Sequence, residues 1–257
     1  LSYRYDLSPA IGDGVATTLD ENSLAISGGF GKIVLGQDDD AGDTYNIDEM
    51  DLPTEEPTGT SASASIGTSS AIASSDAMKV AYHLPAMGGL TAGFSFADSG
   101  YNAGTDTTSY GAQYSMDAAG ASVTLGYAAI TKESATTTDT DQTNMGLKVV
   151  SGDLSMIISQ GTHEAVDEDI DNQGASISYK MPNGMTIAAY TFKSEDALDA
   201  GEELSRSGVE VAYTIASGLT AVVNVEDYDY KVGTDRDGAS TVSDNGTVTQ
   251  LTLKAAF

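Results

Sequence analysis

The sequence contains no cysteine and no tryptophan, and only 5 proline residues among 257. The absence of cysteine fits an envelope protein that is stable without disulfides, although many cytosolic proteins also lack it. No apolar run approaches the ~18 residues that a membrane-spanning helix needs. No signal peptide is visible, so we expect that it has been removed if the protein is exported.

Positive charge is also scarce. Lysine and arginine together number 11 against 38 aspartate and glutamate residues, which gives a formal net charge of -27. Because nucleic-acid binding depends on clustered basic side chains, this composition excludes nucleic acid as a partner. Acidic loops suit either solvation or the binding of divalent cations, and the composition does not separate these two uses.

The residues that catalysis usually requires are missing. His83 and His163 are the only histidines and lie in separate predicted hairpins. No Gly-x-Ser-x-Gly motif, zinc-ligand spacing or glycine-rich phosphate-binding loop is present. We therefore expect a protein that is not an enzyme, in which His83 shares the polar face of its strand with Lys79.

What the sequence does contain is a two-residue alternation of polarity that continues to its last residue. In residues 249–257, Leu251, Leu253 and Phe257 fall on one face, whereas Gln250 and Lys254 fall on the other. Successive side chains of a strand point to opposite faces, so the pattern predicts strands with one apolar and one polar face. The alternation also holds in residues 78–84, 90–96, 110–116, 123–128, 175–181 and 208–215, but shifts phase near Ala188 and breaks at Ile157 and Ile158.

The connections between these strands alternate between short and long. Short turns are predicted at residues 28–31, 85–89, 117–120, 151–153, 182–184 and 216–218, and long polar connections at 8–22, 37–76, 98–107, 131–143, 162–172, 194–205 and 231–245. An up-and-down meander would then have all short turns at one end, as outer-membrane β-barrels do. A soluble β-sandwich or β-solenoid also alternates in polarity but does not predict this asymmetry.

Two segments carry a resemblance to a known family. Residues 24–37 (LAISGGFGKIVLGQ) resemble the hairpin with a Gly-Phe-Gly turn found in general diffusion porins, especially those of alphaproteobacterial type. The last residues resemble the final strand of these porins, in which Leu251, Leu253, Ala255 and the terminal Phe257 form the signal for the barrel-assembly machinery. The resemblance covers nearly the whole chain and implies one all-β transmembrane barrel domain over residues 1–257.

By this resemblance the barrel has 16 antiparallel strands, and the loop after the fifth strand folds into the lumen. Placing residues 31–36 on the fifth strand makes residues 37–76 this constriction loop. The count then closes only if two strands precede Leu1; otherwise the barrel has fourteen strands. Since an unpaired strand edge in lipid is costly, we favour the longer chain.

The resemblance also implies the charged groups of the pore. Acidic residues of the constriction loop are expected to face basic residues of the wall, and their transverse field orients polar solutes. The acidic set is Asp38, Asp39, Asp40, Asp43, Asp48, Glu49, Asp51, Glu55 and Glu56; the basic set is Arg4, Lys32, Lys79, Lys148 and Lys254. The acidic excess predicts a preference for cations, whereas a solvated loop with no role in the pore is the plainer interpretation.

We therefore expect a porin of the bacterial outer membrane: a water-filled channel for passive diffusion of ions and small hydrophilic solutes. Outer-membrane lipid and, by resemblance, a homotrimer are the expected partners. No cofactor is required, but Asp38, Asp40 and Asp43 are a possible calcium site. The alternative is a secreted or surface-layer acidic β protein that binds calcium or adheres.

Overall fold

The computed structural model describes residues 2–8, 18–53, 69–74, 77–98, 104–134, 138–199, 201–231 and 243–255, with the side chains of residues 3–8 and 18–21 left out. Fourteen strands form one antiparallel sheet in which each strand pairs with its neighbours in the chain. They are β1 (Ser2–Ser8), β2 (Thr18–Gly28), β3 (Gly31–Gln37), β4 (Met78–His83), β5 (Leu90–Ala97), β6 (Thr105–Ala118), β7 (Ala121–Ser134), β8 (Thr140–Ser151), β9 (Leu154–Glu164), β10 (Asp169–Lys180), β11 (Met185–Asp196), β12 (Glu203–Ala216), β13 (Leu219–Lys231) and β14 (Asp244–Ala255).

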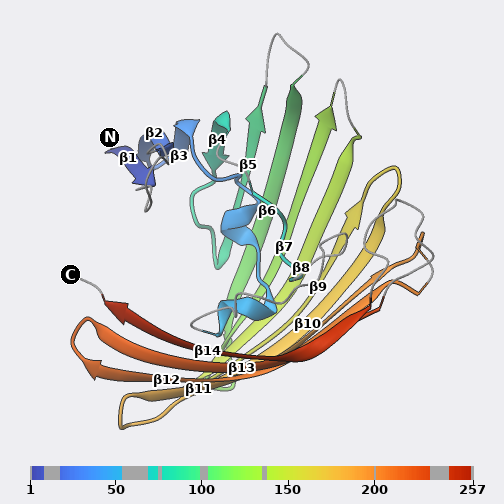
Figure 1. Cartoon of the computed structure of the whole chain (residues 1–257). Coiled ribbons are helices and arrows are strands. Elements are labelled where there is room, and N and C mark those ends of the chain that lie inside the picture. Colours follow the sequence, from blue (N-terminus) through green and yellow to red (C-terminus); the bar gives the residue numbers. More distant parts are fainter. Residues whose placement is uncertain are drawn as a thin grey trace.

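This topology confirms the predicted all-β, up-and-down arrangement. The sheet curls around a central space, and two short 3-10 helices, η1 (Asp43–Tyr45) and η2 (Glu49–Asp51), lie inside the curve (Figure 1). Within the described residues β1 and β14 do not pair with each other. The sixteen strands expected for the full barrel therefore remain a prediction. Among the described residues, no helix is long and apolar enough to cross a membrane.

The six predicted short turns all connect strands in the structure, at residues 29–30, 84–89, 119–120, 152–153, 181–184 and 217–218. They lie at one end of the sheet, which we call the turn end; the opposite end is the loop end. At the loop end the predicted connections were too long, because strands continue into them. The connection between β9 and β10, for example, comprises only residues 165–168. Polar residues such as Thr140 and Asp169 stay in the hydrogen-bonded ladder although the alternation of polarity has faded.

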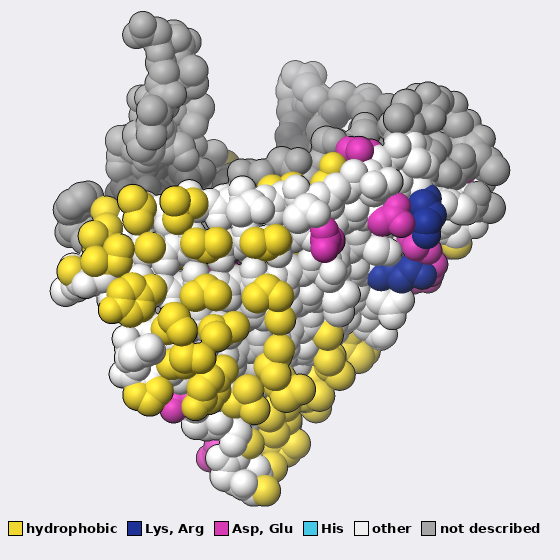
Figure 2. Space-filling model, turned by 60° about the horizontal axis from the view of Figure 1, so that its bottom comes forward, with side chains coloured by type: hydrophobic (Ala, Val, Ile, Leu, Met, Phe, Trp, Pro, Cys, Tyr) yellow, Lys and Arg dark blue, Asp and Glu magenta, His cyan; other side chains and the backbone are white. Residues whose placement is uncertain are grey.

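The two faces of the sheet differ in polarity, and the apolar one points outward. Ile158 is 55% exposed and Leu251 is 71% exposed, and they share this face with exposed Phe94, Tyr110 and Val209. Figure 2 shows hydrophobic side chains spread over one face of the molecule. All described strands belong to a single sheet, so no second sheet covers this face as a sandwich would require. An outward apolar surface of this extent is typical of a protein that contacts lipid.

The inward face is mostly polar or small, but it also carries a buried cluster of Ile170, Phe192, Leu204 and Tyr230 on β10 to β13. Two further clusters involve the connection between β3 and β4: one joins Val34 and Ala81 on the wall to Ala41, and the other joins Ala128 and Ile130 to Ile72. Ala41 and Ile72 both belong to the connection between β3 and β4. Buried apolar packing is therefore found both between the wall and this connection and within the wall itself.

Candidate functional site

We call the connection between β3 and β4 (residues 38–77) the inner loop, and its described parts lie against the inner face of the sheet. Its helix η1 contacts β6 and β7, and η2 contacts β9, β10 and β11 (Figure 1). This is the segment that the resemblance implies folds into the lumen. The described parts of the loop, residues 38–53 and 69–74, pass across the wall. The candidate functional site is therefore the region where the loop and the wall meet.

The loop approaches the wall so closely that side chains on the wall would obstruct it. A Cβ atom at Gly146 would lie 2.3 Å from the carbonyl oxygen of Ile47, and one at Gly174 would lie 2.3 Å from the carboxyl carbon of Glu49. Such distances essentially do not occur between real atoms, so both positions require glycine. The set of wall glycines that face the loop in this way is Gly93, Gly111, Gly126, Gly146, Gly161 and Gly174. We call this set the glycine seat.

Polar side chains beside the glycine seat bind the backbone of the loop. Ser95 Oγ accepts a hydrogen bond from the amide of Ala41 (2.9 Å), and Ser109 Oγ accepts one from the amide of Gly42 (3.0 Å). Asn144 bonds both halves of the loop: its Oδ1 accepts from the amide of Ile47 (3.2 Å), and its Nδ2 donates to the carbonyl of Ser70 (2.9 Å). Because buried backbone groups need partners, these contacts allow an irregular segment to lie flat on a sheet.

Two acidic residues of the predicted set fasten the loop. Lys79 Nζ lies 2.8 Å from Asp40 Oδ1, and the side chains of this ion pair are 0% and 1% exposed. The Glu49 carboxyl is also fully buried, and it accepts hydrogen bonds from Ser70 Oγ (2.6 Å) and from Ser159 Oγ (2.8 Å). Asp40 and Glu49 therefore hold the loop to the wall directly and do not face basic residues across an open space.

Other charges remain accessible between the loop and the wall. Asp38 and Asp39 on the loop, with Lys32 and His83 on β3 and β4, line a cavity of about 200 Å³. His83 Nδ1 is hydrogen-bonded to the hydroxyl of Tyr45 at 2.8 Å, which sets its ring against η1. His83 thus lies on the inward face of β4, the polar face that the sequence predicts it to share with Lys79. Opposite signs thus meet across a small polar space at this point.

The acidity of the loop depends on its packing. Burial, together with the charges of Asp39, Asp40 and Asp51, raises the pKa of Asp43 to about 6. Burial and the charges of Asp51 and Glu49 raise the pKa of Asp48 to about 7, although the Met50 amide and the Asn46 side chain hydrogen-bond its carboxyl group. These two carboxyl groups consequently change charge near neutral pH, whereas a solvated aspartate would not.

The remaining predicted site residues are distributed as follows. Lys148 and Lys254 follow the inward register of their strands, and partial desolvation raises the pKa of Asp51 while the charge of Lys148 opposes that rise. Leu251, Leu253 and Ala255 are exposed on β14, so the barrel-assembly signal stays a prediction. Glu55, Glu56, Phe257 and the side chain of Arg4 lie outside the described residues.

The structure does not bring the suggested calcium ligands together. Asp38 accepts a hydrogen bond from Ser23 Oγ at 2.7 Å, and Asp40 pairs with Lys79. In the part of the chain that the structure describes, no three histidine or acidic side chains are placed to hold a metal ion. Two of the three residues are thus engaged with the wall, and calcium binding at Asp38, Asp40 and Asp43 stays a prediction.

One buried network on the wall was missed from the sequence. Arg206 Nη2 lies 2.9 Å from Glu226 Oε2, its Nε donates to Glu226 Oε1 (3.1 Å), and the Tyr190 hydroxyl donates to Glu226 Oε2 (2.7 Å). All three side chains point inward from β11, β12 and β13. The two-residue alternation of β12 puts Arg206 and the exposed Val209 on opposite faces of the strand. The inward position of Arg206 could therefore have been predicted from the sequence alone.

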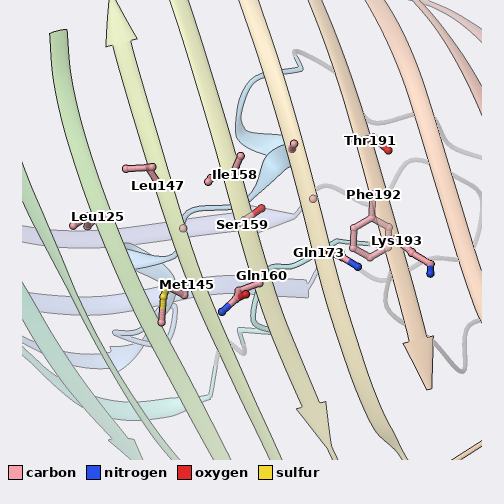
Figure 3. Close-up of a pocket in the computed structure, with 13 residues that line it drawn as sticks. Leu125, Met145, Leu147, Ile158, Ser159, Gln160, Gln173, Thr191, Phe192 and Lys193 are labelled. Atoms are coloured by element: carbon pink, nitrogen blue, oxygen red, sulfur yellow. The ribbon is translucent and has the colours of Figure 1, made fainter. Parts of the chain in front are cut away.

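A groove of about 560 Å³ lies elsewhere, on the outward side of β7 to β11 (Figure 3). Leu125, Met145, Leu147 and Ile158 line it, and Lys193 lies near one end. Leu125 and Leu147 are paired in register, as are Leu147 and Ile158, so these side chains share the outward face. The groove belongs to the apolar outward surface, and its lining also includes Gly146, Ser159 and Gly174, which contact the inner loop on the other side of the wall.

Comparisons with known proteins bear on this arrangement. A family model described as Gram-negative porin matches residues 2–255, and no curated protein matches the sequence. An anion-selective porin from Comamonas acidovorans is 17% identical, with a TM-score of 0.66 over 96% of this chain and 80% of that one. OmpT from Vibrio cholerae, an outer membrane protein in trimer form, is 14% identical, with a TM-score of 0.67 over 98% and 86%. Identities this low show a shared fold.

We predict that the ion pair between Lys79 and Asp40 stabilises the docked loop. The substitution Lys79→Met leaves Asp40 buried without its main counter-charge, which typically costs about 3 to 5 kcal/mol. The double substitution Lys79→Met/Asp40→Leu removes both charges and should recover most of that loss. Thermal unfolding followed by circular dichroism measures both effects.

Lys193→Met is the matched control, because Lys193 is exposed and its ion pairs with Glu195 and Glu203 lie on the outward face. It should leave the unfolding temperature unchanged. A double variant at positions 79 and 40 that is no more stable than the single variant would contradict the assigned role of the pair.

Proposed function

Because this chain belongs to the family of Gram-negative porins, we propose that the inner loop and the wall facing it form the constriction of its channel. The protein resides in the bacterial outer membrane, and its sheet surrounds a channel for diffusion. The observation that carries the proposal is the glycine seat, since it holds an irregular acidic loop inside a sheet whose outer face is apolar. We assign no catalytic residue to the chain.

The alternative of a secreted or surface-layer protein does not account for the outward face. Exposed Phe94, Ile158, Leu251 and Leu253 would contact water in such a protein. Apolar patches of that size are rare on soluble monomers. In the outer membrane the same residues contact hydrocarbon, and the inward polar face contacts water.

We further propose that the channel prefers cations. The accessible loop carboxyl groups, those of Asp38, Asp39, Asp43 and Asp51, extend into the space that solutes must cross. Two wall cations carry their own counter-charge, since Lys79 pairs with Asp40 and Arg206 pairs with Glu226. Lys32 and Lys148 remain to face the loop, and its accessible carboxyl groups outnumber them. Charged groups at a narrow point select ions of opposite sign. The related porin from Comamonas acidovorans is anion-selective, but at 17% identity the likeness extends only to the fold.

The preference for cations should depend on pH. As the pH falls from about 8 to about 5, it passes the pKa of Asp48 (about 7) and that of Asp43 (about 6), and the loop loses negative charge. The cation-to-anion permeability ratio should then fall by a factor of about two to three. The reversal potential across a salt gradient in planar bilayers measures this ratio.

The substitution Asp43→Asn removes one titrating group and should flatten the lower part of this pH profile. Asp171→Asn serves as the control, since Asp171 is exposed on the outward face, between Ile170 and Asn172, which are buried on the inward face. A channel that prefers anions at every pH would refute the proposed selectivity but not the channel itself.

Displacing the loop should widen the channel. In Gly174→Val the new side chain occupies the position of the Glu49 carboxyl, which must leave its place on the wall and give up its hydrogen bond from Ser159, so the loop loses one of its anchors. We expect the single-channel conductance to rise about 1.5-fold, since the constriction limits the flow of ions. The control is Ala175→Val, in which the neighbouring residue on the outward face gains the same side chain. Equal conductance of the two variants, both folded by heat-modifiable gel migration, would mean that the loop does not limit the channel.

We also propose that the protein assembles as a homotrimer in outer-membrane lipid. The support is that OmpT of Vibrio cholerae, a relative by fold, was characterised in trimer form. Chemical cross-linking in native membranes should yield a ladder that stops at three copies. A ladder that stops at one copy at every cross-linker concentration would rule the trimer out.

A further inference from the structure

Lysine side chains on the inner wall gather towards the turn end. Lys32 follows the turn at residues 29–30, Lys180 is the last residue of β10, and Lys254 pairs with Thr220 beside the turn at residues 217–218. Lys148 lies three residues before the end of β8. The four lysines come from strands spread around the sheet, so they border the turn-end mouth of the channel from several sides.

Register places these lysines on the inward face. Lys148 pairs with Ile157, which is buried on the inward face (1% exposed), and Lys32 is two residues from buried Val34. Lys180 shares its face with buried Ser176 and Ser178. Lys32, Lys180 and Lys254 are themselves exposed, so their charges face water inside the mouth.

The loop end of the same inner wall carries the opposite sign. Asp196 and Glu202 lie where β11 leads into β12, and Asp244 begins β14. Asp196 and Asp244 follow the inward register, and Glu202 accepts a hydrogen bond from the inward hydroxyl of Tyr230 (2.6 Å). The accessible carboxylates of the inner loop add to this charge.

Cations at the loop end are engaged. Lys79 pairs with Asp40, Arg206 pairs with Glu226, and Lys132 Nζ donates to the carbonyl of Ala73 at 3.3 Å. Among the described side chains, carboxylates outnumber cations at this end, whereas at the turn-end mouth the four lysines outnumber the inward carboxylate of Asp117. The two signs are therefore separated along the channel axis as well as across it.

We propose that this axial separation of charge makes the channel rectify ionic current. The inference rests on the proposed channel but is independent of which ion the constriction prefers. When the loop side is positive, cations enter through the acidic end and anions through the basic end, so both enter where fixed charge concentrates them. Ions then accumulate inside, and the conductance rises. With the opposite polarity both ions are drawn out of the channel, and the conductance falls.

The test is the current–voltage curve of the full chain in planar bilayers in symmetric KCl. Since the chain has no cysteine, Asn183→Cys in an exposed short turn provides a single thiol. A maleimide-polyethylene glycol too large to pass the channel then reports which side carries the turns. At ~0.01 M salt, where the Debye length is about 30 Å, we expect the current with the loop side positive to be roughly two-fold larger. At ~1 M, where that length is about 3 Å, the curve should be nearly linear.

Lys180→Gln/Lys254→Gln removes two charges from the turn-end mouth and should bring the ratio at low salt close to one. The matched control, Lys193→Gln/Lys231→Gln, removes two charges from the outward face and should leave the ratio unchanged. Conducting channels with a linear curve at low salt, or a ratio that survives the first substitution, would overturn the axial inference alone. No conductance from any variant, each folded by heat-modifiable gel migration, would overturn the proposed function and this inference with it.

Discussion

Pairing of the backbone is the constraint from which the rest of this structure follows. In hydrocarbon an unpaired amide or carbonyl group costs several kcal/mol, so a chain that crosses lipid with strands must bond each one to its neighbours. Here one ladder runs from β1 to β14 in chain order. Each strand of that ladder has two faces. Leu251 is exposed on the outward face, which contacts hydrocarbon, whereas its neighbour Gln250 lies on the inward face, which contacts water.

The inner loop meets the same constraint by another route. Its backbone is irregular, so its amides cannot join a ladder, and the wall supplies partners such as Ser95, Ser109 and Asn144. The glycine seat allows the approach that these hydrogen bonds need. The close contact and the hydrogen bonds of the loop backbone thus depend on each other. The glycine seat carries no charge, but it holds the negatively charged loop inside the channel.

Much of the fold was predictable from the sequence because side-chain alternation and turn chemistry are local signals. The six short turns and the inward lysines of β3, β8 and β14 were found in this way. Two interruptions of the pattern were misleading: the apparent phase shift in β11 reflects Tyr190 and Phe192, which point inward without any change of register. Likewise Ile157 is apolar but buried on the inward face, while Ile158 is exposed on the outward face.

The site was less predictable, since it depends on contacts between distant segments. The sequence identifies the acidic side chains of positions 37–76 as one set. It does not reveal that Asp40 and Glu49 are buried while Asp39 stays accessible. That division arises from partners such as Lys79 and Ser159, which no local pattern connects to the loop. Arg206 and Glu226 form their pair across two strands, and only the register of β12 and β13 brings them together.

The reach of the inner loop has a consequence for the order of assembly. Its contacts join residues far apart in the chain: Glu49 is bonded to Ser159, 110 positions away, and Ile47 to Asn144, 97 positions away. Strands joined by a hairpin, in contrast, pair through residues that lie close together in the sequence. The surface that receives the loop is made by β5 to β11 together, so the loop can reach its docked position only where these strands already lie side by side.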